Sequence, residues 1–289
     1  MTEFVRPLHG PAPSLVAPEG TVDTHMHIIA QEFPQSPKIP PHPPASLEDY
    51  AIVQKRLGIR RAVLVQPNAY QDDNSCLEAC LNVMGEEARG IAVVWPEVSD
   101  EELDRLHQLG VRGARIMDIG PGAVSSKYLH AVAERISGFG WHPIVQFNGR
   151  EIADYEQKLS DLTGTYVIDH AGKYIPPVTP DSAEFATLLR LVDKGNCYVK
   201  LSACYETSLV GAPGYDDVGA LSKALVAHAP ERLLWASNWP HVSATPESYP
   251  DDARTLDVLL DWVPDDVTRK MILQDNAEAL YGFEPMGGA

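Results

Sequence analysis

The chain has 289 residues, which is longer than most single domains but within the size range of one β/α barrel of about 250 residues. Its formal net charge of −17 argues against nucleic acid and anionic membranes as partners, because both attract clustered Lys and Arg. A few local cations could still bind an anionic small molecule. The N-terminus lacks an apolar signal region, and no apolar run approaches the roughly 18 residues of a membrane helix, so we expect a cytoplasmic protein.

Short apolar runs alternate with amphipathic stretches along the chain, after an irregular lead-in over residues 1–20. The runs predicted as strands are Thr21–Ile28, Arg61–Gln66, Gly90–Val94, Gly113–Met117, Pro143–Phe147, Tyr166–Asp169, Cys197–Leu201 and Leu233–Ser237. Helices are predicted over Leu47–Leu57, Cys76–Glu87, Glu101–Leu109, Tyr128–Phe139, Ile152–Leu162, Ala183–Asp193 and Gly219–His228, with a last helical stretch from Pro250 to about Tyr281. This alternation predicts an α/β fold, a (β/α)8 TIM barrel, in one domain over residues 1–289. A doubly wound open sheet is the alternative, but no GxGxxG motif follows the first strand.

Two compositional features are secondary to this pattern. The cysteines Cys76, Cys80, Cys197 and Cys204 form no CxxC pair and are expected to be small buried hydrophobes. The proline-rich segment 34–44 cannot be helical. It follows the first strand, so in a barrel it lies at the C-terminal face, where active sites are built. It is predicted to be either a stiff wall or lid of the pocket or a plain surface connection.

Polar residues stand where three of the predicted strands end. His25 and His27, two residues apart on the first strand, point to the same side. His170 follows the apolar end of the sixth strand, and Asn238 follows that of the eighth. Strand-end residues at the C-terminal face of a barrel are catalytic more often than structural, so these side chains are predicted to share one site.

The segments His25-Met26-His27, Asp169-His170 and Ser237-Asn238-Trp239-Pro240-His241 together resemble the amidohydrolase superfamily, over about residues 20–283. The pattern is most similar to the branch that contains 2-pyrone-4,6-dicarboxylate lactonases and galactarolactone isomerases. That branch typically carries Thr/Ser-Asp-Trp-Pro-His on its last strand, whereas this chain has Asn238 in place of the Asp.

Many members of the superfamily bind divalent metals through the paired histidines, a Lys or Glu on the fourth strand, further histidines and a final Asp. Here the fourth strand carries Arg115 and the fifth carries Gln146, and neither supplies the usual ligand. Three histidines remain that could hold Zn²⁺ together with water. The resemblance to the lactonase branch implies that no metal and no other cofactor is used.

The Asn at position 238 bears on the reaction. In the hydrolases the corresponding Asp takes a proton from the attacking water, which an amide cannot do. An intramolecular lactone shift needs no activated water, because a hydroxyl of the substrate attacks the ring ester. The resemblance and Asn238 together predict a lactone isomerase that converts D-galactaro-1,5-lactone to D-galactaro-1,4-lactone in sugar-acid catabolism.

Three alternatives remain open at this point. The first is a metal-independent lactonase that hydrolyses a related carboxylated lactone such as 2-pyrone-4,6-dicarboxylate. The second is a metal-dependent decarboxylase or amide hydrolase of the wider superfamily. The third is a non-catalytic binding protein on a barrel scaffold. The partner in every case is a small molecule, and the sequence leaves the oligomeric state open.

The resemblance implies a role for each candidate residue. His25, His27 and His170 are expected to surround the carbonyl, donate hydrogen bonds to the oxyanion and move a proton, while Asn238 positions the attacking hydroxyl. Arg115 is expected to hold the substrate carboxylate, with Lys200 as a second cation. Further substrate-binding candidates are the strand-end amides Gln66, Asn68, Gln146 and Asn148, and, from position alone, Tyr205 and His241.

Overall fold

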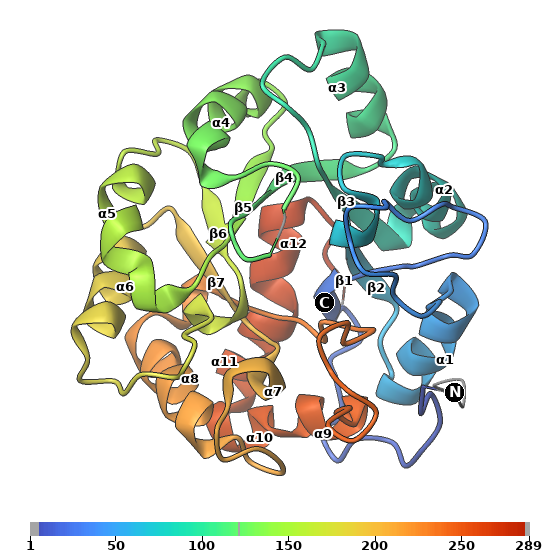
Figure 1. Cartoon of the computed structure of the whole chain (residues 1–289). Coiled ribbons are helices and arrows are strands. Elements are labelled where there is room, and N and C mark those ends of the chain that lie inside the picture. Colours follow the sequence, from blue (N-terminus) through green and yellow to red (C-terminus); the bar gives the residue numbers. More distant parts are fainter. Residues whose placement is uncertain (1–5, 121, 287–289) are drawn as a thin grey trace.

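The computed structural model describes residues 6–120 and 122–286, and within them eight parallel strands follow one another around a barrel in chain order (Figure 1). The strands are β1 Val22–Met26, β2 Arg61–Val65, β3 Ala88–Ala92, β4 Val111–Met117, β5 His142–Gln146, β6 Tyr166–Ile168, β7 Cys197–Leu201 and β8 Leu233–Trp235. Each strand pairs with the next one in sequence. The predicted (β/α)8 barrel is therefore confirmed, and the open doubly wound sheet is excluded.

The barrel closes between β1 and the segment that follows β8. The backbone N–H of Asn238 donates to the carbonyl of His25 at 2.9 Å, and that of His27 donates to the carbonyl of Trp239 at 2.8 Å. The buried carboxylate of Asp23 accepts from the backbone N–H of Ser237 at 2.9 Å. These contacts bring the predicted first and last motifs next to each other.

The helices that cover the barrel are α1 Leu47–Leu57, α2 Ser75–Met84, α3 Asp100–Gln108, α4 Leu129–Ser137, α5 Ile152–Ser160, α6 Ala183–Asp193 and α8 Asp216–His228. The predicted bounds of α1 and α6 agree with the structure. Ser46 caps α1 in a reciprocal pair with Asp49, and Gly58 ends it in the left-handed conformation, so both termini are encoded locally. The short helix α7 Cys204–Thr207 was not predicted, because four residues carry too little periodicity to be recognised.

The predicted helical stretch from Pro250 to Tyr281 is wrong as one element. The structure divides it into α9 Asp252–Asp257, α10 Leu259–Trp262, α11 Asp266–Lys270, a π-helical turn and α12 Asn276–Tyr281. The residue before a proline avoids the helical conformation, and Val263, which precedes Pro264 at the end of α10, has non-helical backbone angles (φ −134°, ψ 75°). Asp265 then caps α11 through its side chain.

A separate apolar cluster fills the barrel interior and closes its N-terminal end. It joins the inward-facing strand residues Val22, Val63, Val65, Ile91, Ile144, Val167 and Leu234 to Ala277, Tyr281 and Phe283 of the C-terminal segment. Helix α12 accordingly lies behind the barrel centre in Figure 1. Because this cluster blocks the N-terminal end, a ligand is expected to enter the barrel at the C-terminal ends of the strands.

The proline-rich segment 34–44 has no helix, as predicted, and forms part of the pocket wall. A β-bridge between Ile29 and Ala45, which flank this segment, holds the chain on its two sides together. The backbone groups of these two residues exchange hydrogen bonds of 2.9 and 2.8 Å. The Gln35 side chain bonds both backbone groups of His42, and His42 lines the main cavity.

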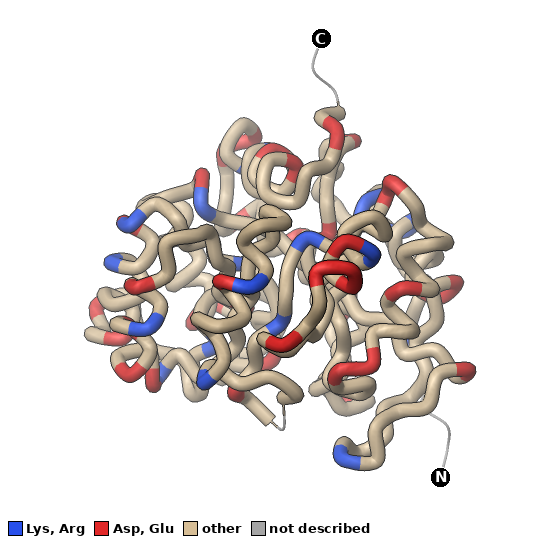
Figure 2. Tube along the Cα trace, turned by 90° about the horizontal axis from the view of Figure 1, so that it is seen from above, with Lys and Arg blue, Asp and Glu red and all other residues tan. Residues whose placement is uncertain are grey.

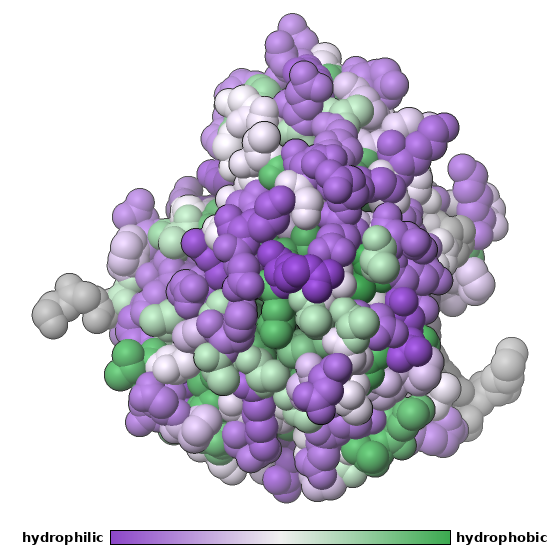
Figure 3. Space-filling view, turned by 90° about the vertical axis from the view of Figure 1, so that its left-hand side faces the viewer, coloured by the Kyte–Doolittle hydropathy of each residue, from purple (hydrophilic) through white to green (hydrophobic). Residues whose placement is uncertain are grey.

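The surface of the described part is mixed in charge, with Lys and Arg interspersed among the more numerous Asp and Glu (Figure 2). The face in Figure 3 is mainly hydrophilic, with apolar residues in small groups. No helix among the described residues is both long and apolar enough to cross a membrane. All four cysteines are buried and unpaired by disulfides, as predicted.

Candidate active site

A cavity of about 190 Å³ opens at the C-terminal ends of the strands. This is below the roughly 300–1,000 Å³ that drug-sized ligands occupy, so it suits a small molecule. Its polar lining residues are His27, His42, Asn68, Arg115, Gln146, His170, Lys173, Glu206, Asn238 and Ser243. Three hollows are larger: two, of about 350 and 860 Å³, lie beside α4, and one, of about 280 Å³, lies beside α9 and α10, and none of them is lined by residues at these strand ends. The convergence of polar groups makes the smaller cavity the candidate site.

An irregularity in β1 turns the paired histidines toward this end of the barrel, but only His27 lines the cavity, whereas His25, predicted to surround the substrate carbonyl, is fully buried and does not line it. Val22 lies in the apolar interior, whereas His25, three residues later, faces the polar end of the same barrel. Residues an odd number apart lie on opposite faces of a regular strand. The register between β1 and β2 shifts between Asp23 and Met26, and this shift permits both to face inward.

The ring nitrogens of His25 and His27 make polar contacts with each other and with neighbouring groups of the protein. Their Nε2 atoms lie 3.2 Å apart, and Nδ1 of His27 is 2.7 Å from the carbonyl oxygen of Val65. Nδ1 of His25 lies 3.2 Å from Asp169 Oδ1 and 3.2 Å from Lys200 Nζ. All four ring nitrogens thus have partners, and burial lowers the pKa of His25 to about 4, so its ring is neutral at pH 7.

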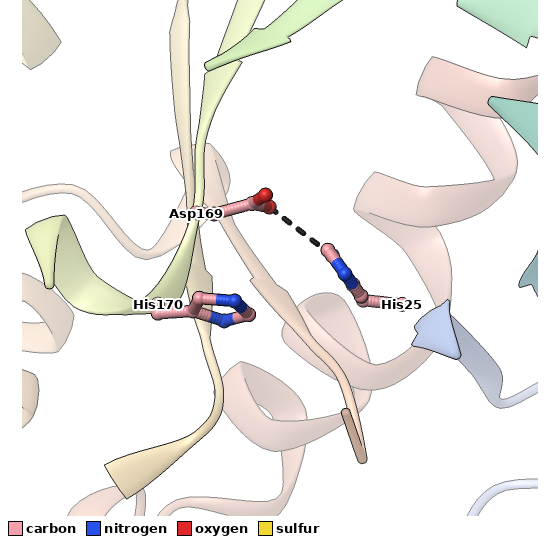
Figure 4. A group of neighbouring side chains, drawn as sticks. All are labelled: His25, Asp169 and His170. Carbon is pink, nitrogen blue, oxygen red and sulfur yellow. Dashed lines mark hydrogen bonds and ion pairs between the residues drawn. The ribbon is translucent and has the colours of Figure 1, made fainter. Parts of the chain in front are cut away.

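His170 differs because one of its ring nitrogens has no partner among the described residues. Its Nδ1 lies 2.8 Å from Ser202 Oγ, and the residue lines the cavity. Its ring lies beside that of His25 (Figure 4), with 5.0 Å between the two ring centroids. The turn after β6 places His170 in the left-handed conformation, with a φ of 56°. Burial lowers its pKa, so this imidazole too is neutral and can both give and accept a proton.

Lys200 is not where its predicted role requires. Its side chain is fully buried on β7, 3.3 Å from Asp169 Oδ1, and it does not line the cavity. Burial opposes ionisation of Asp169, but the adjacent Lys200 ammonium nevertheless holds the pKa of Asp169 well below its usual value. Inward-facing side chains of a barrel stack in layers. Lys200 lies in a layer below the cavity, against His25, and the sequence did not reveal to which layer it belongs.

Arg115 lines the cavity. Its Nη1 donates to the backbone carbonyl of Gln66 at 2.7 Å, and its Nη2 donates to Oε1 of Gln146 at 3.0 Å. These bonds fix the orientation of the guanidinium, which carries five N–H groups in all and so keeps donors for a ligand. Gln146 supports Arg115 from the neighbouring strand and also lines the cavity.

Asn238 lies at the cavity within a polar network that the sequence did not predict. Its Nδ2 donates to the Tyr205 hydroxyl at 2.7 Å and to Oε1 of Glu206 at 3.2 Å. Glu206 also accepts from Ser243 Oγ at 2.6 Å and forms an ion pair with Lys173. Burial disfavours ionisation of Glu206, yet Lys173 and the hydrogen bonds lower its pKa to about 2.

This network fixes which way the Asn238 amide points. An ionised carboxylate only accepts hydrogen bonds, so the NH₂ group of Asn238 must face Glu206. The amide oxygen, for which no partner occurs among the described residues, is left for the cavity. Glu206, next to the candidate Tyr205 on α7, and Lys173, on the loop after β6, were missed because no motif or strand end marks either position.

The remaining candidates divide into one that lines the cavity and several that support the structure. Asn68 lines the cavity. Gln66 instead donates to the backbone of the loop after β2, Asn148 bonds both backbone groups of Ile175, and His241 pairs with Asp252 at 2.8 Å. Tyr205 contacts Asn238 without lining the cavity. The polar groups of these side chains are hydrogen-bonded to loop backbone, to a buried carboxylate or to Asn238. Their positions near strand ends in the sequence did not indicate these partners.

His25, Asp169 and His170 are the described residues whose arrangement comes nearest to a metal centre. Their ligand atoms lie within 4.8 Å of one another. However, the Lys200 ammonium already lies within 3.3 Å of two of these ligands, and Arg115 adds a second positive charge that disfavours a proton on His25. A divalent cation there would be repelled by Lys200, so this donor set does not fit a metal.

Comparison with known proteins identifies relatives along the whole chain. Residues 22–283 match the family model described as Amidohydrolase. A D-galactarolactone isomerase from Agrobacterium fabrum is 40% identical, with 99% of each chain covered, and a 2-pyrone-4,6-dicarboxylate hydrolase from Comamonas testosteroni is 32% identical, with 93% of this chain and 92% of that one covered. A crystal structure of an Agrobacterium tumefaciens protein without ligand has a TM-score of 0.92 at 38% identity, covering 96% of this chain and 99% of that chain.

Proposed function

The chain belongs to the amidohydrolase family, and we propose that within it the protein is a lactone isomerase that converts D-galactaro-1,5-lactone to D-galactaro-1,4-lactone. The D-galactarolactone isomerase that is 40% identical over nearly the whole length of both chains supports this activity. We further propose that the reaction serves the breakdown of sugar acids derived from D-galacturonate.

The proposed reaction is an intramolecular acyl transfer. A hydroxyl oxygen of the substrate forms a bond to the ring ester carbon, and the bond from that carbon to the former ring oxygen breaks. The proton of the attacking hydroxyl ends on the leaving oxygen, so no water is consumed. Because nucleophile and carbonyl belong to one molecule, the protein needs mainly to hold them in a reactive geometry.

The observation that carries this proposal is the orientation of Asn238. Its amide oxygen is available to accept the hydrogen bond of the attacking hydroxyl, which directs a lone pair of that hydroxyl at the ester carbonyl. The amide cannot take the proton, and Glu206, with a pKa of about 2, is a poor base for water. Because neither Asn238 nor Glu206 can deprotonate a water at this position, isomerisation is favoured over hydrolysis.

Proton transfer is assigned to His170. Its ring is neutral, one nitrogen is held by Ser202, and it lines the cavity. A neutral imidazole can accept the proton of the attacking hydroxyl and return it to the leaving oxygen. His25 and His27, whose nitrogens are bonded elsewhere, instead support this end of the site.

Arg115 is proposed to bind the substrate carboxylate. Replacing Arg115 with Met is expected to raise KM by about 10- to 100-fold, since a hydrogen bond to a charged group contributes ~1.5–3 kcal/mol. Steady-state kinetics on the 1,5-lactone measure this effect. Arg112 on the same strand donates to the backbone carbonyls of His107 and Val111, so Arg112→Met is the matched control. An equal KM increase in both variants would contradict the assignment.

The reaction is proposed to need no metal, because the Lys200 ammonium lies against the available ligands. Protein treated with a strong chelator and then desalted is therefore expected to keep its full rate, and added Zn²⁺, Mn²⁺ or Mg²⁺ is expected to leave it unchanged. Metal analysis by mass spectrometry accompanies the assay. A rate that falls on chelation and returns with one of these ions would refute the metal-free reaction.

The test of the function is proton NMR of the chelator-treated protein with freshly made D-galactaro-1,5-lactone. The proposal expects the 1,4-lactone before any open diacid. Diacid as the first product would instead establish a lactonase, the alternative that three lactone hydrolases at 32% identity support. No conversion of this lactone, with 2-pyrone-4,6-dicarboxylate consumed, would move the substrate to the pyrone class.

A further inference from the structure

The paired histidines form a chain of hydrogen bonds whose direction can be assigned. A carbonyl oxygen only accepts, so the Nδ1 atom of His27, 2.7 Å from the carbonyl of Val65, carries a proton. The Nε2 atom of a neutral His27 is then an acceptor. Because the Nε2 atom of His25 lies 3.2 Å from it, the proton between the two rings belongs to His25.

This assignment leaves the Nδ1 atom of His25 without a proton. It lies 3.2 Å from Asp169 Oδ1, and two acceptors cannot bond each other. Lys200 resolves the conflict, because its Nζ lies 3.2 Å from that nitrogen and 3.3 Å from the carboxylate oxygen and, as an ammonium, donates to both. Burial lowers the pKa of Lys200, and the adjacent Asp169 carboxylate acts against this and favours the ammonium. The side chains of His25, Asp169 and Lys200 are all 0% exposed, so bulk water cannot replace the ammonium.

We propose that Lys200 is a positioning residue whose ammonium selects the tautomers of His25 and His27. With Lys200 in place, the hydrogen bonds run from Lys200 through His25 and His27 to Val65 and use every nitrogen of both rings. No nitrogen of either ring then remains to bind a metal or to accept a proton from the substrate, so proton transfer is assigned to His170. That last consequence rests on the proposed isomerase reaction, whereas the tautomer assignment does not.

Long-range ¹H–¹⁵N NMR of the unmodified protein at pH 7 tests the assignment directly, since the ¹⁵N shifts distinguish protonated from unprotonated ring nitrogens. Signals are assigned by their loss in His25→Asn and His27→Asn variants. We expect the proton of His25 on Nε2 and that of His27 on Nδ1. A proton on Nδ1 of His25, in the neutral or charged ring, would overturn the proposal. No turnover is measured, so failure of the isomerase assignment leaves this result intact.

The variant Lys200→Met tests the role of the ammonium. Without it, the His25 ring is expected to move its proton to Nδ1 and donate to Asp169, and the bond to His27 is lost. Lys223→Met removes a surface lysine that pairs with Asp261 and is the matched control, with both tautomers unchanged. Unchanged tautomers in a folded Lys200→Met protein would refute the role. If that variant does not fold, the tautomers of the unmodified protein decide the proposal alone.

Discussion

Asn238→Asp is expected to raise lactone hydrolysis by about 10²- to 10⁴-fold, the usual effect of a general base, at the expense of isomerisation. Asn238 lies 3.2 Å from Glu206, which its surroundings keep ionised with a pKa of about 2. A second carboxyl group beside that charge has its own pKa raised, which makes it a stronger base. The base acts when deprotonated, so hydrolysis should increase as the pH rises through this pKa. Proton NMR of the products over a pH series measures both reactions.

The control for this variant is Asn68→Asp, which introduces the same change on another part of the cavity wall. It is expected to leave hydrolysis low, because Asn68 does not contact Glu206 or Tyr205 in the network that holds Asn238. Flat hydrolysis in Asn238→Asp, or an equal increase in both variants, would show that position 238 does not determine the fate of the lactone.

His170→Asn is expected to lower the isomerisation rate by about 10²- to 10⁴-fold with a small change in KM. Asn can keep the hydrogen bond to Ser202 and presents a polar group to the cavity, but its amide cannot carry the proton from one oxygen to the other. Steady-state kinetics give the rate, and thermal unfolding shows whether the fold is kept.

Two comparisons separate a chemical from a structural effect at this position. His130→Asn changes an exposed histidine on α4 and should leave the rate unchanged. Ser202→Ala keeps the His170 ring but removes the hydrogen bond that orients it, so an intermediate loss is expected. A His170→Asn protein with near-normal turnover would remove His170 from the reaction and return the proton transfer to His27 or to the substrate itself.

The larger elements of the fold could be predicted because their signals are local. The bounds of α1, α6 and β7 follow from apolar spacing and from caps such as Ser46 and Gly58. The C-terminal stretch failed for a related reason, because Pro264 divides an amphipathic pattern that spacing alone presents as continuous. Residues at strand ends were also predictable as a group, since parallel strands in a barrel all end at one face.

The sequence by itself thus determined the barrel, the end at which the site lies, and the presence at the cavity of His27, Arg115, His170 and Asn238. Only the tertiary structure decided what each of them can do, because hydrogen-bond partners come from strands far apart in the chain. In the folded chain His25 and His27 contact each other, Lys200 contacts His25, and Glu206 accepts a hydrogen bond from Asn238. A ring nitrogen or amide acts on a ligand only when the protein has not already engaged it, and that depends on side-chain geometry across the closed barrel.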